Sequence, residues 1–153
     1  MNRTLLALLI VAWLPGLASA EGLSYRGWGP RVGLSVDPDQ VVAGVHIDLG
    51  QLVKKLRFQP NLDIGYGDDA LFVGAYLGAY WFFDVDGHWD FYAGSDLGMI
   101  YEDIDYRDSD LDVAFNAVGG IETRMSNNSR LLIELKVGVI ENPDFKLMVG
   151  WTF

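Results

Sequence analysis

The last nine residues, Phe145-Lys-Leu-Met-Val-Gly-Trp-Thr-Phe153, decide the fold of this chain. Apolar residues stand at every odd position of this stretch, and the even positions hold Lys146, Met148, Gly150 and Thr152. Because successive side chains of a β-strand point to opposite faces, this period of two predicts a strand with one apolar face and one mixed face.

Seven earlier segments repeat the alternation, and clusters of Asp, Asn, Gly and Pro separate them as turns require. The eight predicted strands lie at residues 31–36, 41–49, 57–65, 71–81, 91–99, 112–124, 131–139 and 145–153. A tilted strand of about nine or more residues crosses a bilayer. The pattern therefore predicts an all-β fold, an eight-stranded antiparallel up-and-down transmembrane β-barrel. Pro60 lacks a backbone donor, so we expect a bulge near it or a later start of its strand.

The two faces of these strands differ in charge. The apolar set contains no charged residue, whereas the opposite set carries five bases and six acids, counting Asp112 and Lys146. In an outer-membrane barrel the apolar set faces lipid, and in a soluble periplasmic barrel it faces the core. The near balance favours an enclosed ionic network, because buried ions need partners. The predicted lumen network comprises Arg31, His46, Asp48, Arg57, Asp63, Asp96, Glu122, Arg124, Glu134 and Lys136.

The tryptophans also favour a membrane. In an up-and-down barrel they all fall at one end, as an interfacial aromatic belt requires. The predicted belt is Trp28, Trp81, Trp89 and Trp151.

Residues 1–20 have the pattern of a cleaved secretory signal peptide. A short polar start with Arg3 precedes an apolar stretch, Leu5 to Leu14, and Ala18-Ser19-Ala20 supplies small residues at the cleavage position. The apolar stretch is shorter than the roughly 20 residues of a membrane-spanning helix. We expect residues 21–153 to form the barrel after export through the periplasm, with the bacterial outer membrane as its location.

The C-terminal strand resembles the C-terminal signature of bacterial outer-membrane proteins. The matching residues are Phe145, Leu147, Val149, Trp151 and Phe153. With the strand count and the signal peptide, residues 21–153 resemble the small eight-stranded barrels of the OmpA transmembrane domain and OmpX type. The resemblance implies a Gram-negative envelope protein whose last strand is an assembly signal for the barrel-assembly machinery, and contact with outer-membrane lipid and lipopolysaccharide.

Composition excludes several functions. The 153 residues carry a net charge of −10, with 11 Lys and Arg against 21 Asp and Glu. Nucleic-acid binding needs a basic surface, so it is not expected. The absence of cysteine excludes disulfides, cysteine-based zinc sites and a cysteine lipid anchor. No cofactor is expected.

The connections at the end opposite the termini are acidic. Those near 37–39, 67–69, 102–110 and 141–144 hold 11 of the 21 acids, with Arg107 as their only base. Candidates for a metal site are Glu102, Asp103, Asp105, Asp108 and Asp110, since calcium takes several oxygen ligands. This loop lacks the glycine and closing glutamate of an EF-hand, so a solvated loop is the alternative. A further hypothesis is that divalent cations bridge these acids to lipopolysaccharide phosphates.

No catalytic site is predicted. His46, Asp48 and Ser35 share the inward face, an arrangement that would suggest hydrolysis, but no strained G-x-S-x-G turn is present. Glycines gather on the same face and allow a cavity or pore, although eight-stranded barrels are usually filled by side chains. The first hypothesis is a non-enzymatic barrel for envelope integrity or surface interaction. The alternatives are a ligand-binding or narrow, porin-like pore and, less favoured, a barrel hydrolase acting on lipid.

Overall fold

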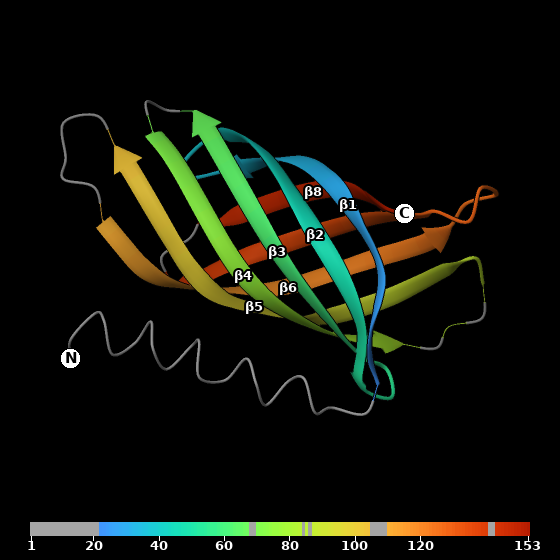
Figure 1. The fold of residues 1–153 in the computed structure, drawn as a ribbon. Coiled ribbons are helices and arrows are strands. Elements are labelled where there is room, and N and C mark those ends of the chain that lie inside the picture. The colour runs from blue at the N-terminus through green and yellow to red at the C-terminus, as the bar shows by residue number, and fades with distance from the viewer. Residues whose placement is uncertain (1–21, 68–69, 84, 86, 105–109, 141–142) are drawn as a thin grey trace.

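A computed structural model describes residues 22–67, 70–83, 85, 87–104, 110–140 and 143–153 (Figure 1). For residues 103, 104 and 110 it describes the backbone alone. The predicted signal peptide, residues 1–20, lies outside the described residues, and its cleavage stays a prediction. Among the described residues no helix is long and apolar enough to span a membrane.

Eight strands form one closed antiparallel barrel in which each strand pairs with the next along the chain. The strands are β1 (Leu23–Val36), β2 (Gln40–Val53), β3 (Leu56–Gly67), β4 (Ala70–Phe83), β5 (Trp89–Ile104), β6 (Asp110–Arg124), β7 (Arg130–Ile140) and β8 (Phe145–Thr152). Strand β1 also pairs with β8, from Arg31 opposite Gly150 to Val36 opposite Phe145, and this pairing closes the barrel. The predicted all-β, eight-stranded up-and-down barrel is confirmed.

The apolar face of each strand points outward and the charged face points inward. In β8, Leu147 is 54% exposed while its neighbours Lys146 and Met148 are fully buried. A soluble barrel would bury the apolar set and expose the charges. The structure exposes the apolar set and buries the charged set, which is the opposite of what the soluble alternative requires.

The backbone near Pro60 contains the expected irregularity. Between the pairs His46–Asn61 and Gln51–Arg57, β2 advances by five residues and β3 by four. The extra residue in β2 is a bulge on the strand opposite Pro60, where the ladder lacks one donor. The bulge is confirmed, whereas the alternative of a later strand start is wrong, since β3 begins before Pro60.

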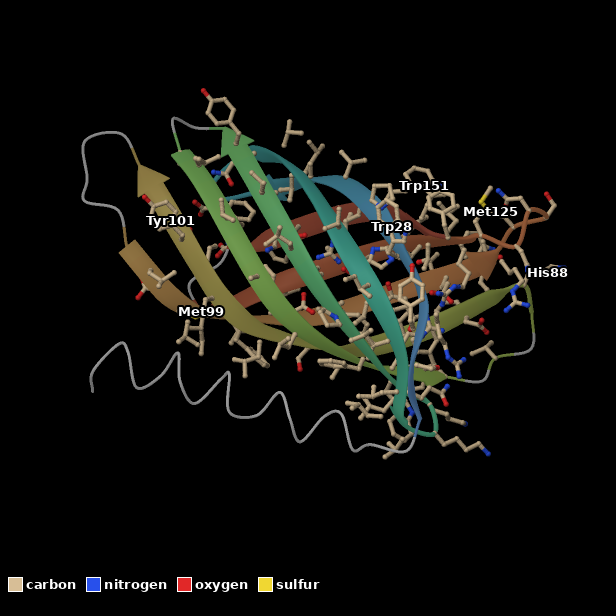
Figure 2. The ribbon with its side chains drawn as sticks, viewed as in Figure 1. Trp28, His88, Met99, Tyr101, Met125 and Trp151 are labelled. Atoms are coloured by element: carbon tan, nitrogen blue, oxygen red, sulfur yellow. The ribbon has the colours of Figure 1, made fainter. Side chains whose placement is uncertain are left out.

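The barrel has two distinct ends. The terminal end holds the start of β1, the end of β8 and the turns after β2, β4 and β6; the loop end holds the other four connections (Figure 1). Figure 2 shows Trp28 and Trp151 close together toward the terminal end, and Tyr101 at the loop end. Backbone hydrogen bonds between Trp28 and Phe153 join β1 to the end of the chain, with N–O distances of 3.3 and 2.9 Å.

Candidate functional site: the ionic lumen

Arg31 of β1 lies at the centre of the lumen and binds acids from two other strands. Its Nε and Nη2 donate to Asp63 Oδ1 on β3 at 3.0 and 2.7 Å. Its Nη1 donates to Glu134 Oε1 on β7 at 3.2 Å, and its Nη2 also donates to Asn61 Oδ1. All these side chains are buried. Arg31 therefore ties the first strand to both sides of the barrel.

Lys136 of β7 forms the second cationic centre. Its Nζ lies 2.5 Å from Asp96 Oδ2, 3.5 Å from Glu134 Oε1 and 3.6 Å from Asp63 Oδ2. The carboxylates receive further donors from tyrosines: Tyr80 donates to Asp96 at 2.6 Å, and Tyr92 donates to Glu134 at 2.9 Å. We name Arg31, Lys136, Asp63, Asp96 and Glu134, together with Asn61, Tyr80 and Tyr92, the central network. Charge-assisted hydrogen bonds of this kind offset much of the cost of burying ions.

A second set of ion pairs closes the lumen at the terminal end. Arg57 Nη1 lies 2.7 Å from Glu122 Oε2, and Arg130 Nη2 lies 2.7 Å from Asp48 Oδ2. Longer pairs, Arg57 to Asp48 at 3.6 Å and Arg130 to Glu122 at 3.4 Å, complete a four-membered ring. This terminal ring joins β2, β3, β6 and β7 across the barrel, and its two positive charges balance its two negative charges.

The position of Arg124 corrects the predicted lumen set. Arg124 is exposed, and Arg130, its register partner on β7, joins the terminal ring instead. Both side chains have the inward parity, but Arg124 is the last residue of β6. The inward face meets solvent there, so burial is not imposed on it.

The lumen toward the loop end is mainly apolar. Its buried cluster consists of Val42, Phe72, Tyr76, Ile100, Ala114 and Met148. Lys146 is the cation of this region, with its Nζ 5.3 Å from the Phe72 ring centroid and 4.9 Å from that of Tyr76. Cation–π contacts at these distances stabilise the charge of the Lys146 ammonium away from water.

Aromatic rings cover several of the inward glycines. A Cβ placed on Gly65 would collide with the ring of Phe72, and one on Gly120 would collide with the ring of Tyr92. These glycines make room for rings that cross the lumen. The described lumen is therefore filled at these levels by side chains rather than lined by glycine around open space.

The hydrolase arrangement does not form. His46 is buried and its Nε2 lies 2.8 Å from Thr152 Oγ1. The Ser35 hydroxyl donates to the Pro38 carbonyl at 2.9 Å. In the β1–β2 register Ser35 lies opposite Gln40, whereas His46 lies opposite Gly29. Six residues of strand, roughly 20 Å at about 3.3 Å per residue, separate the two positions. The structure thus keeps the histidine and the serine apart.

The outward residues of the sequence prediction lie on the outer surface. Trp28, Trp81 and Trp89 are exposed and Trp151 is partly exposed, all near the terminal end. In β8, Phe145 and Leu147 are exposed and Val149 is partly exposed, and Phe153 follows the strand. Their roles as an interfacial belt and as an assembly signal stay predictions.

The acidic candidates of the β5–β6 loop are only partly described. Asp105 and Asp108 lie outside the described residues, and of Asp103 and Asp110 only the backbone is described. Glu102 is the one candidate whose side chain is described, and it is partly buried at the end of β5. In the described part of the chain no three His, Asp or Glu side chains gather into a metal-binding group.

Sequence reasoning did not predict a polar contact in the lumen for four uncharged side chains and one arginine. They are Asn61, Tyr80, Tyr92, Thr152 and Arg130. The parity of each strand carries the signal, because each of these residues lies on the inward face of its strand, although on β4 that face holds no charged residue. Arg130 precedes residue 131, the predicted start of its strand, and the other four residues carry no charge.

The fold and the lumen define a class: a closed eight-stranded barrel with an apolar exterior and an ionic interior. Neither a protein-family model nor a curated protein matches the sequence. Solved structures share the fold, and three of them illustrate the similarity. Neisserial surface protein A has a TM-score of 0.66 and 12% identity, covering 84% of this chain and 94% of that one. The N-terminal β-barrel domain of OprF from Pseudomonas aeruginosa has a TM-score of 0.56 and 16% identity, and the match covers 87% of this chain and 100% of that domain.

The third structure is the outer membrane protein Ail of Yersinia pestis in a phospholipid bilayer nanodisc. It has a TM-score of 0.52 and 10% identity, and the match covers 83% of this chain and 97% of the Ail chain. At these identities the similarity concerns the fold, which is that of small bacterial outer-membrane barrels.

Proposed function

We propose that this chain is a non-enzymatic outer-membrane barrel of a Gram-negative envelope, one that contributes to envelope integrity or surface interactions through its exterior and its loop end. One observation carries the proposal: the strands bury their ions and expose their apolar side chains, as Leu147 and Lys146 illustrate. Lipid accepts such an exterior, and a closed barrel leaves no backbone group unpaired within it. Resemblance in fold to Neisserial surface protein A and to the outer membrane protein Ail supports the same location.

The filled lumen favours a structural role over transport. The central network and the terminal ring lie at successive levels, and each joins strands that are not neighbours in the sheet through buried or partly buried ion pairs. A passing ion would have to displace these pairs, at the cost of leaving buried charges without partners.

The proposed partners follow from the ends of the barrel. Lipopolysaccharide would meet the acidic loop end, where divalent cations are needed to bridge carboxylates to phosphates. The exposed apolar residues of β8 are proposed as the segment that the barrel-assembly machinery reads.

The first test of the proposed location is heat-modifiability. The chain from Glu21 onward contains every strand of the barrel, and it is folded into detergent or lipid. We expect gel migration to differ between unheated and boiled samples, together with β-rich circular dichroism only when detergent or lipid is present, because the apolar exterior needs an apolar solvent. A monodisperse, folded protein in plain buffer would contradict the proposal.

Conductance in planar bilayers separates the structural role from the pore alternative. For the inserted barrel we expect a current at the noise level, since the side chains of the central network occupy the lumen. A substantially larger-bore porin serves as the positive control for the membrane. Discrete, reproducible current steps from the purified barrel would favour the pore instead.

A further inference from the structure

Two exposed bases stand at the terminal end of the first three strands. Arg26 lies near the start of β1, and Lys54 lies in the turn between β2 and β3. Within the described part of the chain, neither forms an ion pair. Exposed apolar residues flank them along the chain: Tyr25 at 66%, Trp28 at 50% and Val53 at 57% exposure. We name these five residues the basic rim.

A backbone irregularity turns part of this rim outward. Between the pairs Leu23–Gly50 and Gly27–Asp48, β1 advances by four residues while β2 advances by two. Residues 24–26 therefore leave the alternation and are all exposed. A Cβ on Gly50 would lie 3.1 Å from Arg26 Nε, so the arginine side chain lies against β2 at this glycine. The bulge thus directs Arg26 toward the strand that leads to Lys54.

The basic rim and the loop end differ in charge. The loop-end connections hold 11 of the 21 acids with one base, whereas the turn after β2 contributes Lys54 and Lys55 with no acid between Gly50 and Arg57. An anionic partner is therefore attracted at the basic rim and repelled at the loop end. Because the rim continues the apolar exterior, this partner meets the bases beside hydrophobic surface. Anionic lipid offers both features, since its phosphate lies directly above its acyl chains.

We propose that Arg26 and Lys54 bind the phosphate groups of anionic phospholipids in the leaflet at the terminal end. Tyr25 and Trp28 lie at headgroup level, where aromatic side chains favour the membrane interface. The bases extend from the apolar surface to the phosphates. This inference rests on the proposed function, because it requires the apolar exterior to lie in a bilayer.

Tryptophan quenching by brominated lipid tests the proposal at the rim itself. The chain from Glu21 onward is folded into vesicles of phosphatidylcholine and phosphatidylglycerol in equal amounts, with bromine on one lipid or the other. In one reporter Trp81, Trp89 and Trp151 are replaced by Phe, so that Trp28 reports on the basic rim. In the second reporter only Trp89 is kept, which begins β5 beside the exposed Asp90.

We expect brominated phosphatidylglycerol to quench Trp28 at least about threefold more effectively than brominated phosphatidylcholine, because the two nearby bases attract the anionic lipid. Trp89 should show no such preference. The preference of Trp28 should disappear in the R26Q/K54Q variant, and also in about 1 M salt, where the Debye length falls to about 3 Å. Arg124→Gln is the matched control, because it removes an exposed base at the same end on β6, and it should leave the preference intact.

Heat-modifiability of each variant shows whether it is folded and inserted. An inserted barrel in which Trp28 is quenched equally by the two lipids overturns this inference and leaves the proposed function standing. A preference that falls as much with Arg124→Gln as with R26Q/K54Q overturns the assignment to Arg26 and Lys54. A wild-type chain that does not insert at all overturns the proposed function, and this inference with it.

Discussion

Replacing Arg31 with Met is expected to lower the free energy of unfolding by about 3–5 kcal/mol, the usual cost of removing one partner from a buried ion pair. The guanidinium donates to Asp63, Glu134 and Asn61, all within the lumen. Methionine fills much of the volume but donates nothing, so two buried carboxylates lose their main partner. Urea titration of the barrel in vesicles, followed by tryptophan fluorescence, measures the change.

Two further variants show whether the loss comes from uncompensated charge. Arg124→Met removes an exposed arginine at the terminal end, and its effect should stay within about 0.5 kcal/mol. The triple variant R31M/D63N/E134Q removes the carboxylate charges as well and should recover part of the lost stability. If Arg31→Met were as stable as the wild-type barrel, the central network would not hold the strands together.

Replacing Leu135 with Arg is expected to destabilise the inserted barrel by about 2–4 kcal/mol, the cost of a base on the lipid face near the bilayer midplane. Leu135 lies midway along β7 and is 46% exposed. In water, a substitution at such a position changes stability by no more than about 0.5 kcal/mol. The size of the effect therefore reports which solvent surrounds the barrel. The same urea titration in vesicles measures it.

The matched control for Leu135→Arg is Val53→Arg. Val53 is also outward and exposed, but it ends β2 at the terminal end, where a base costs only about 0–1 kcal/mol. A large difference between the two variants is expected from a membrane whose apolar core covers the middle of the strands. Equal, small effects at both positions would mean that water reaches the whole exterior, and the membrane location would be wrong.

The ion pairs of the lumen connect strands that the backbone ladders leave unconnected. The central network links β1 with β3 and β7, and the terminal ring links β3 with β6 and β2 with β7. These contacts cross the barrel, whereas the backbone ladders join only neighbouring strands. The ion pairs therefore add cross-links that hydrogen bonding between strands does not supply.

Alternation along each segment was sufficient to predict the strands, their number and their two faces. Lys146, between Phe145 and Leu147, shows why: the pleat places successive side chains on opposite faces whatever the rest of the chain does. The inward position of nine of the ten predicted lumen residues follows from the same local rule. Arg124 keeps the inward parity but is exposed, because a strand end, unlike a strand middle, is not enclosed.

The partners of those residues could not be predicted from the sequence. Arg31 and Glu134 are 103 positions apart, and Lys136 reaches Asp96 and Asp63 on two different strands. Which side chains meet across a lumen depends on how far each strand is staggered when the sheet closes. The two-residue period is a property of the backbone and can be read locally, but the stagger, and with it the ionic network, exists only after β1 has paired with β8.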